Sequence, residues 1–397
     1  MPMSTTLRAS VPVCIPLAYF WISVFAFCVV VSTPLSRRFL RLPLQLVVIG
    51  FIWLSFSTTN LWAEPLDSLW GLLMVVWISH STSLMWFEQP LSFFDSKDEN
   101  CRQQTAFCTP QQVSGVAPAK SPRNLATFAL VRIGKLVVYG LSTVYLLPRV
   151  FPGPFSPMEV SEFDSLHETY LRRLLLQTQH PNPVTLRESL IRSIWAVLWA
   201  WGAYALIDAA HDALALLFVV VLRVDAPEAW PPLFGSLADA YSIRRFWGKF
   251  WHRGIVLPYL NYGKLFSRRL LGLTPGSTAD RVLLFFMVFF LSGVAHALVA
   301  WQLGDCCGWV RDIAWFCGNF VAGAVEASVA WQLRSFAARC GYTKQWRKMS
   351  ESVFAKALGF AWVFAFFFWS VPKWQYPKLY CAMQHEMALL EPDGNLV

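Results

Sequence analysis

Residues 282–303 read VLLFFMVFFLSGVAHALVAWQL, a run that contains no Asp, Glu, Lys or Arg. A hydrocarbon core about 30 Å thick is crossed by about twenty residues of α-helix, because each residue rises about 1.5 Å. The run has this length and composition. We therefore predict that it spans a membrane as a single helix.

Similar runs recur along the whole chain of 397 residues. Hydrophobic residues make up 56% of the chain and charged residues 14%, which is more apolar surface than one water-soluble core can bury. We expect an all-α, polytopic integral membrane protein with about eight transmembrane helices. The predicted spans are residues 11–31, 42–62, 66–87, 125–147, 193–222, 282–303, 309–333 and 354–371.

The run 125–147 differs from the other spans because it contains Arg132 and Lys135. Two cations inside a span are costly unless they are buried in protein or reach the membrane interface. At the level of sequence, whether this run crosses the membrane therefore stays open.

The basic residues predict how the spans are oriented. With the N-terminus outside the cytosol, the cytosolic loops 32–41, 88–124, 223–281 and 334–353 hold 21 Lys and Arg residues, and the opposite side holds 8. Cytosolic loops generally carry the excess of these residues, so we predict this orientation. The same loops account for the formal net charge of +9, and we expect no nucleic-acid partner.

The nine cysteines form no C-x-x-C pair and no Cys/His pattern with zinc spacing. Several lie inside apolar runs. We interpret them as small hydrophobic side chains, and we expect neither a disulfide framework nor a metal site.

A histidine, His296, lies within the opening run, fifteen residues after Arg281. An ionisable residue in a span is expensive to bury and is therefore a functional candidate. Ser292 and Phe289 share its helical face to within about 40°. A buried neutral imidazole suits general-base catalysis, because burial favours the form that accepts a proton. The residues alone leave a purely structural hydrogen bond equally open.

The segment RRFWGKFWHRG, from Arg244 to Gly254, precedes this span. It is typical of a juxtamembrane belt, in which Trp side chains anchor the chain and cations meet lipid phosphates. The alternative is that the cations contact the phosphates of an acyl-CoA while aromatic rings enclose its thioester. The candidate binding residues are Arg244, Arg245, Phe246, Trp247, Lys249, Trp251 and Ser292, and His252 is a second candidate at the reacting centre.

The motifs F-W-G-x-x-W-H, ending at His252, and F-x-x-S-G-x-x-H, ending at His296, together resemble the wax-synthase-like branch of the membrane-bound O-acyltransferase family. The close similarity covers residues 231–303. It implies a helical membrane enzyme that moves an acyl group from acyl-CoA to a hydroxyl, with His296 catalytic and His252 in a supporting role. It implies an acyl-CoA and a hydrophobic alcohol as partners within the lipid bilayer, and no further cofactor.

The chain also resembles fungal acetyltransferases of terpenoid and meroterpenoid pathways, which share this domain. That resemblance implies acetyl-CoA as donor, a polycyclic alcohol as acceptor and a multi-pass protein of the endoplasmic reticulum. Two alternatives are a long-chain wax-ester synthase and a non-catalytic lipid transporter or binding protein. No internal repeat is visible, which weakens the transporter hypothesis. The oligomeric state stays unknown.

These expectations divide the chain into two regions. Residues 1–222 form N-terminal transmembrane helices with polar loops 88–124 and 148–192, and residues 223–397 form the catalytic region with the last three transmembrane helices.

Five further polar residues are weaker candidates. His80 and the pair His211–Asp212 lie within apolar runs, where they either line a cavity or make structural hydrogen bonds, the second being the commoner case. Asp239 and Asn261 flank the first motif and either orient it or cap loops.

Overall fold

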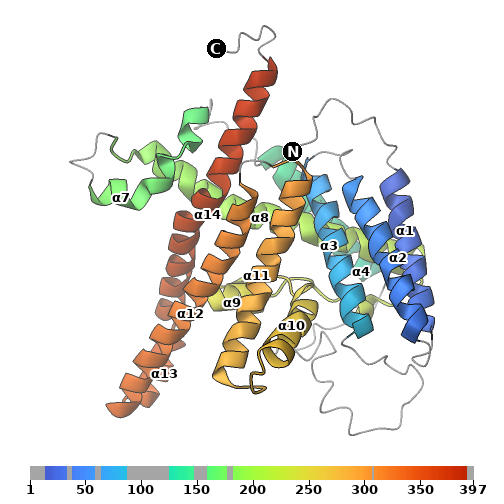
Figure 1. Ribbon diagram of the computed structural model, residues 1–397. Helices are drawn as coiled ribbons and strands as arrows, with labels where there is room; N and C mark the ends of the chain where they lie inside the picture. Colours follow the sequence, from blue (N-terminus) through green and yellow to red (C-terminus); the bar gives the residue numbers. More distant parts are fainter. Residues whose placement is uncertain are drawn as a thin grey trace. The chain divides into compact units, whose positions relative to one another are not determined.

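The computed structural model describes residues 14–33, 38–58, 64–86, 125–146, 159–176, 182–305 and 308–390. Over these residues the chain is helical and has no strand, which confirms the all-α prediction (Figure 1). The described part holds seven helices long and apolar enough to cross a membrane, and Arg41–Ser57 is a shorter apolar helix at the second predicted span. The protein is thus a polytopic membrane protein. The polar loop 88–124 lies outside the described residues.

The chain folds into two compact units, and each unit is assembled from two separate stretches of sequence. Unit 1 comprises residues 1–95 and 253–322, and unit 2 comprises residues 96–252 and 323–397. The predicted division at residue 222 stays a prediction.

Unit 1 begins with three helices that lie side by side (Figure 1): α1 (Cys14–Ser32), α2 (Arg38–Ser57) and α3 (Glu64–Trp86). Together with Val299 of α11 (Thr278–Gln302) they enclose an apolar core. The buried members of this core are Ala26, Val30, Val48, Ile52, Phe56, Met74 and Val299.

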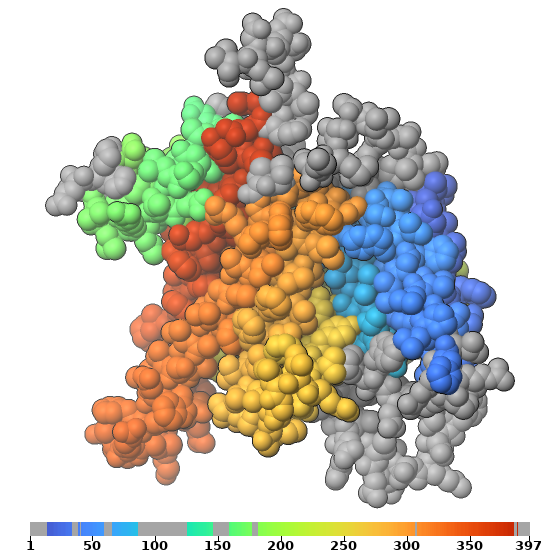
Figure 2. Space-filling view, in the orientation of Figure 1, coloured from blue at the N-terminus to red at the C-terminus, as the bar shows by residue number. Residues whose placement is uncertain are grey.

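The rest of unit 1 carries the second motif. It contains α10 (Val256–Lys264), its π-helical continuation η11 (Leu265–Leu270), α11 (Thr278–Gln302) and the first part of α12 (Trp309–Arg339). Helices α10 and α11 form one continuous surface of side chains in Figure 2. A Cβ atom on Gly263 would lie 3.0 Å from Leu284, so glycine allows α10 to approach α11 this closely.

The start of α11 is fixed by one buried carboxylate. Asp280 accepts hydrogen bonds from Ser267 Oγ at 2.6 Å and from the Gly276 N–H at 2.8 Å, and Arg268 pairs with it at 3.0 Å. Its own N–H donates to Ser277 Oγ, the N-cap of α11. A carboxylate at a helix N-terminus is also favoured by the helix dipole. The loop between η11 and α11 is therefore held in one conformation.

Unit 2 is built on three long helices: α4 (Leu125–Leu141), α8 (Leu186–Ala215) and α14 (Val353–Leu390). Helix α8 starts at an N-cap, Thr185, whose side chain accepts from the Glu188 N–H. The shorter elements of the unit are η4 (Ser142–Leu146), η5 (Val160–Phe163), η6 (His167–Thr169), α7 (Tyr170–Leu175), η7 (Leu216–Val221), η8 (Pro227–Ala229), η9 (Leu237–Asp239), α9 (Ile243–Arg245), η10 (Phe246–Phe250) and α13 (Thr343–Ser350).

Helix α14 continues well beyond the predicted end of its span at residue 371. Pro372 and Pro377 lie inside it, although proline disfavours a helix interior. The helix persists because tertiary packing outweighs that cost: Tyr376 is fully buried, and its ring meets that of Phe163 edge to face at 5.1 Å.

One cysteine prediction is wrong in this helix. Cys381 is disulfide-bonded, so it is not merely a small hydrophobic side chain.

Candidate active site

His296 lies on α11, six residues before the helix ends at Gln302. Its imidazole stacks on the ring of Phe316 from α12, with centroids 4.9 Å apart and ring planes at 27°. The neighbouring residues Ala295 and Ala297 are small and buried, with exposed fractions of 8% and 3%. The histidine side chain is half-buried against this ring.

The position of His296 on α11 follows from its two close-packed neighbours along the helix. A Cβ atom on Gly293 would lie 2.7 Å from the Ile313 Cα, so Gly293 faces α12. Val299 faces α3, because a Cβ atom on Gly71 would lie 2.8 Å from its side chain. Each residue turns the helix by about 100°, so His296 lies about 60° from each of them. The imidazole is therefore directed between α3 and α12.

The two residues predicted to share this face behave differently. Ser292 donates its hydroxyl to the Val288 carbonyl of its own helix at 2.7 Å. Phe289 contacts the ring of Phe320 at 6.2 Å. In this state the Ser292 hydroxyl is used locally, and its predicted role in substrate binding stays a prediction.

Helix α10, which follows the first motif, is held by polar groups of α3. His80 Nε2 donates to the Gly254 carbonyl at 2.5 Å, and Asn261 Nδ2 donates to Ser83 Oγ at 2.9 Å. Tyr262 donates to the Ser79 carbonyl at 3.0 Å. Burial raises the pKa of the Tyr262 hydroxyl, so it stays protonated and can donate. His80 thus makes the structural hydrogen bond that was the commoner expectation, whereas Asn261, predicted to orient the first motif or cap a loop, binds α3.

The first motif occupies α9 and the π-helix η10 in unit 2. Ser242 caps α9 by accepting from the Arg245 N–H at 3.2 Å. Arg245 Nε donates to the Asp239 carbonyl at 3.0 Å and forms an ion pair with the Asp239 carboxylate. Its guanidinium also lies 4.3 Å from the centre of the Tyr241 ring. Arg245 is therefore bound within its own loop. Through this contact Asp239 orients the first motif, which is one of the two roles predicted for Asp239.

The aromatic residues of the motif are divided between core and surface. Phe246 and Trp251 are buried and stack on each other at 5.3 Å, and both pack on Trp199 of α8. Phe246 also meets Phe367 of α14 at 4.9 Å. Trp247 is half-buried, while Lys249 is exposed. The buried rings therefore hold η10 against α8 and α14.

His252 follows η10 and is half-buried among rings. Its imidazole lies 5.6 Å from Phe234, edge to face, and 5.8 Å from Trp251. The structure thus brings His252 together with the first motif in unit 2, and Ser292 together with His296 in unit 1.

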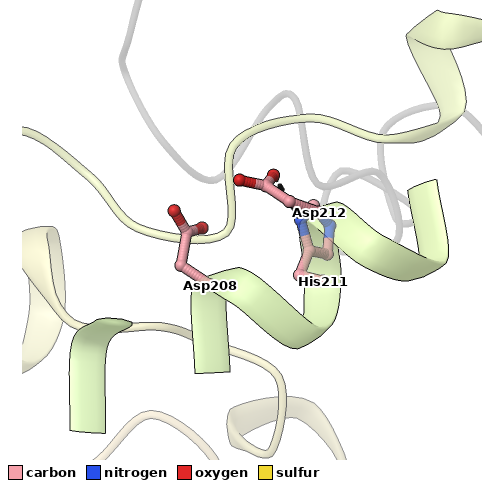
Figure 3. Close-up of side chains that lie close together, drawn as sticks. All are labelled: Asp208, His211 and Asp212. Atoms are coloured by element: carbon pink, nitrogen blue, oxygen red, sulfur yellow. Dashed lines mark ion pairs between the residues drawn. The ribbon is translucent and has the colours of Figure 1, made fainter. Parts of the chain in front are cut away.

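Another intramembrane histidine, His211, has a different setting. Asp208, His211 and Asp212 project from α8, and one ligand atom of each lies within 4.8 Å of the others (Figure 3). Cations from α4 meet both carboxylates: Arg132 pairs with Asp212, and Lys135 pairs with Asp208 and with Asp212, the latter at 2.9 Å. Two carboxylates facing two cations are balanced in charge, and a metal ion would have to displace those partners.

These ion pairs address the uncertainty over the fourth span. Leu125–Tyr145 is long and apolar enough to cross a membrane, and its two cations are compensated within unit 2. Arg132 also donates to His211 Nδ1 at 3.3 Å and to the Trp230 carbonyl at 2.5 Å. Because both cations are paired with carboxylates, they no longer make a membrane span at this position costly.

One residue of the site region was not found from the sequence. Glu326 lies in α12, within the predicted span 309–333, and its carboxylate accepts from the Ile243 N–H at the start of α9 at 2.8 Å. A carboxylate in the middle of an apolar run is the same signal that singled out His296, and it was available in the sequence.

Comparison with known proteins adds to this geometry. Residues 230–318 match the model of the family described as membrane bound O-acyl transferase. A stretch of 122 residues is 39% identical to the acetyltransferase atnC of Arthrinium sp., covering 30% of this chain and 28% of that protein. The acetyltransferase ple2 of Rhodocybe pseudopiperita is 30% identical over 57% of this chain and 60% of its own length.

A third relative, the acetyltransferase nanB of Aspergillus nanangensis, is 32% identical over 50% of this chain and 46% of its own length. The chain thus spans between 28% and 60% of the length of these relatives. No solved structure matches. Residues 230–318, which hold both motifs and the start of α12, match the membrane bound O-acyl transferase family, and the resemblance indicated by the motifs is confirmed.

Proposed function

We propose that this protein is an O-acetyltransferase that transfers the acetyl group of acetyl-CoA to a hydroxyl of a terpenoid or meroterpenoid, with His296 as general base. The observation that carries the proposal is the setting of His296. Its imidazole is directed between α3 and α12 and stacks on Phe316. His296 is also the last residue of the motif that lies inside the family match. A base that is half-buried against an aromatic ring is partly shielded from bulk water, which suits proton transfer at a bound alcohol.

The reaction needs no covalent enzyme intermediate. His296 takes the proton of the acceptor hydroxyl as its oxygen attacks the thioester carbonyl. A carbon–oxygen bond forms, the carbon–sulfur bond breaks, and CoA leaves as a thiol that carries the proton returned by the imidazole. Holding both substrates in one site makes the attack effectively unimolecular.

The donor is expected to bind at the first motif. Arg244 and Lys249 are exposed there, while Arg245 is bound to Asp239. The predicted cytosolic loop 223–281 carries nine Lys and Arg residues, which favours the approach of an anionic CoA from that side. The acceptor is apolar and enters from the bilayer. Three relatives named as acetyltransferases support acetyl as the transferred group. We place the protein in the endoplasmic reticulum.

The test is product analysis with purified protein. Acetyl-CoA and a series of longer acyl-CoAs are incubated with a panel of polycyclic alcohols and fatty alcohols, and esters are identified by mass spectrometry. We expect an acetate ester of a polycyclic alcohol. Esters formed only from long acyl donors and fatty alcohols would assign a wax-ester synthase instead. Absence of any ester, together with lipid movement in reconstituted vesicles, would assign a transporter.

A further inference from the structure

Glu326 of α12 accepts from three donors, two on α9 and one on α14 of unit 2. Its carboxylate accepts from the Ile243 N–H at 2.8 Å, from Arg244 Nε at 3.3 Å and from Trp362 Nε1 of α14 at 3.2 Å. The side chain is only 15% exposed. A carboxylate buried to this degree in an apolar helix is costly unless such donors compensate it.

The contact fixes the direction in which Arg244 leaves α9. Nε donates to Glu326, and within the described residues the two Nη groups make no hydrogen bond. The Arg244 side chain is 56% exposed. An arginine held through Nε presents its two Nη groups as a pair, which is the geometry that binds phosphate oxygens.

Gly323, one turn before Glu326 on α12, provides room for the stem of Arg244. A Cβ atom on Gly323 would lie 3.3 Å from Arg244 Cγ, which is tighter than ordinary contact. Residues three apart lie on the same helical face, so Gly323 and Glu326 form one seat for this arginine.

We propose that Glu326 is a positioning residue that orients Arg244 toward the phosphates of the acyl donor, with Gly323 completing the seat. This inference rests on the proposed function for the identity of the donor. It separates two adjacent arginines that the sequence treats alike: Arg244 contacts the donor, and Arg245 holds the loop.

The sign of the effect needs an argument, because Glu326 also neutralises Arg244. Removing the carboxylate charge leaves the site more positive, but exposed charges attract weakly in water. Losing the orientation weakens a charge-assisted hydrogen bond to phosphate, which is the larger effect. Glu326→Gln is therefore expected to weaken donor binding.

The experiment measures binding of CoA to the full-length protein in detergent, without turnover. Glu326→Gln is expected to raise the Kd for CoA about tenfold, and Arg244→Ala about thirtyfold. Pantetheine, which has the thiol arm of CoA but no phosphate, is expected to bind wild type and Glu326→Gln with equal affinity. Trp362→Phe, which removes one donor to Glu326 and leaves Arg244 in place, is the matched control and is expected to change the Kd less than twofold.

A double variant tests whether Glu326 acts through Arg244. Adding Glu326→Gln to Arg244→Ala is expected to cause no further loss of CoA binding, because the oriented group is already absent. If Glu326→Gln reduces the amount of folded protein, Gly323→Ala gives an independent test. Its methyl group pushes the Arg244 stem and is expected to raise the Kd about threefold, while the Glu326 carboxylate still accepts from the Ile243 N–H.

An unchanged or lowered Kd for CoA in both Glu326→Gln and Gly323→Ala would overturn the inference, as would equal weakening of CoA and pantetheine. A different result would separate the two proposals. If the wild type binds CoA but forms no ester, and the variants lose CoA binding, the positioning role is supported and the proposed acetyl transfer is rejected.

Discussion

His211 and His296 both lie inside membrane helices of this protein, and their surroundings differ. His211 of α8 accepts from Arg132 and neighbours two carboxylates that are paired with cations of α4. His296 of α11 stacks on Phe316 among small buried residues. The two settings suit different roles for an ionisable group in a span. A charge-balanced network holds helices together, whereas an imidazole against an apolar ring is suited to exchange a proton with a substrate.

The largest expected effect separates the two histidines directly. His296→Ala is expected to lower kcat by about a thousandfold, because general-base catalysis is lost, while protein accumulation is unchanged. His211→Ala is the matched control on α8. It is expected to keep kcat within about twofold per folded molecule, since His211 takes part in no step of the proposed reaction. Turnover normalised to folded protein is measured for both. Equal losses would show that the contrast between the two settings has no catalytic meaning.

The second prediction concerns the charge network that surrounds His211. Asp212→Asn leaves the buried guanidinium of Arg132 without its carboxylate and is expected to destabilise unit 2 by about 3–5 kcal/mol. Thermal unfolding in detergent measures this loss. The double variant Arg132→Met with Asp212→Leu is expected to recover most of it, because no uncompensated charge is left. Failure of that recovery would mean that the ion pair does more than balance charge.

The third prediction tests the close packing beside His296. Gly293→Ala places a methyl group 2.7 Å from the Ile313 backbone and is expected to cost about 1–3 kcal/mol and to reduce kcat, because α11 and α12 must separate. Gly318→Ala is the control: no atom lies within 4 Å of its Cβ position, so the expected change is zero or a gain of about 0.5 kcal/mol. Thermal unfolding and turnover are measured together, and equal behaviour of the two variants would contradict the packing argument.

The smallest expected effect belongs to His252. His252→Ala is expected to lower kcat about tenfold, less than His296→Ala, because its imidazole sits among Phe234 and Trp251 and has a supporting role. The ratio of the two losses in one assay is the measurement. A complete loss in both variants would mean that the two histidines act as a pair of equal importance.

The sequence by itself determined the class of the protein and its main candidate. Runs of about twenty apolar residues have one stable solution in lipid, since backbone groups must bond within a helix, so the spans could be read directly. His296 was found because an ionisable residue stands out in such a run. The extent of the last helix was not determined: the predicted span ends at residue 371, whereas α14 continues to Leu390, where Tyr376 is fully buried.

Only the tertiary structure decided which polar residues have partners. Arg132 and Lys135 looked costly until Asp212 and Asp208, about 80 residues later, were found beside them. Arg244 and Arg245 looked equivalent until Asp239 and Glu326 separated them. The physical reason is that the energy of a buried charge depends on groups within a few ångströms, and distance along the chain does not encode which groups those are.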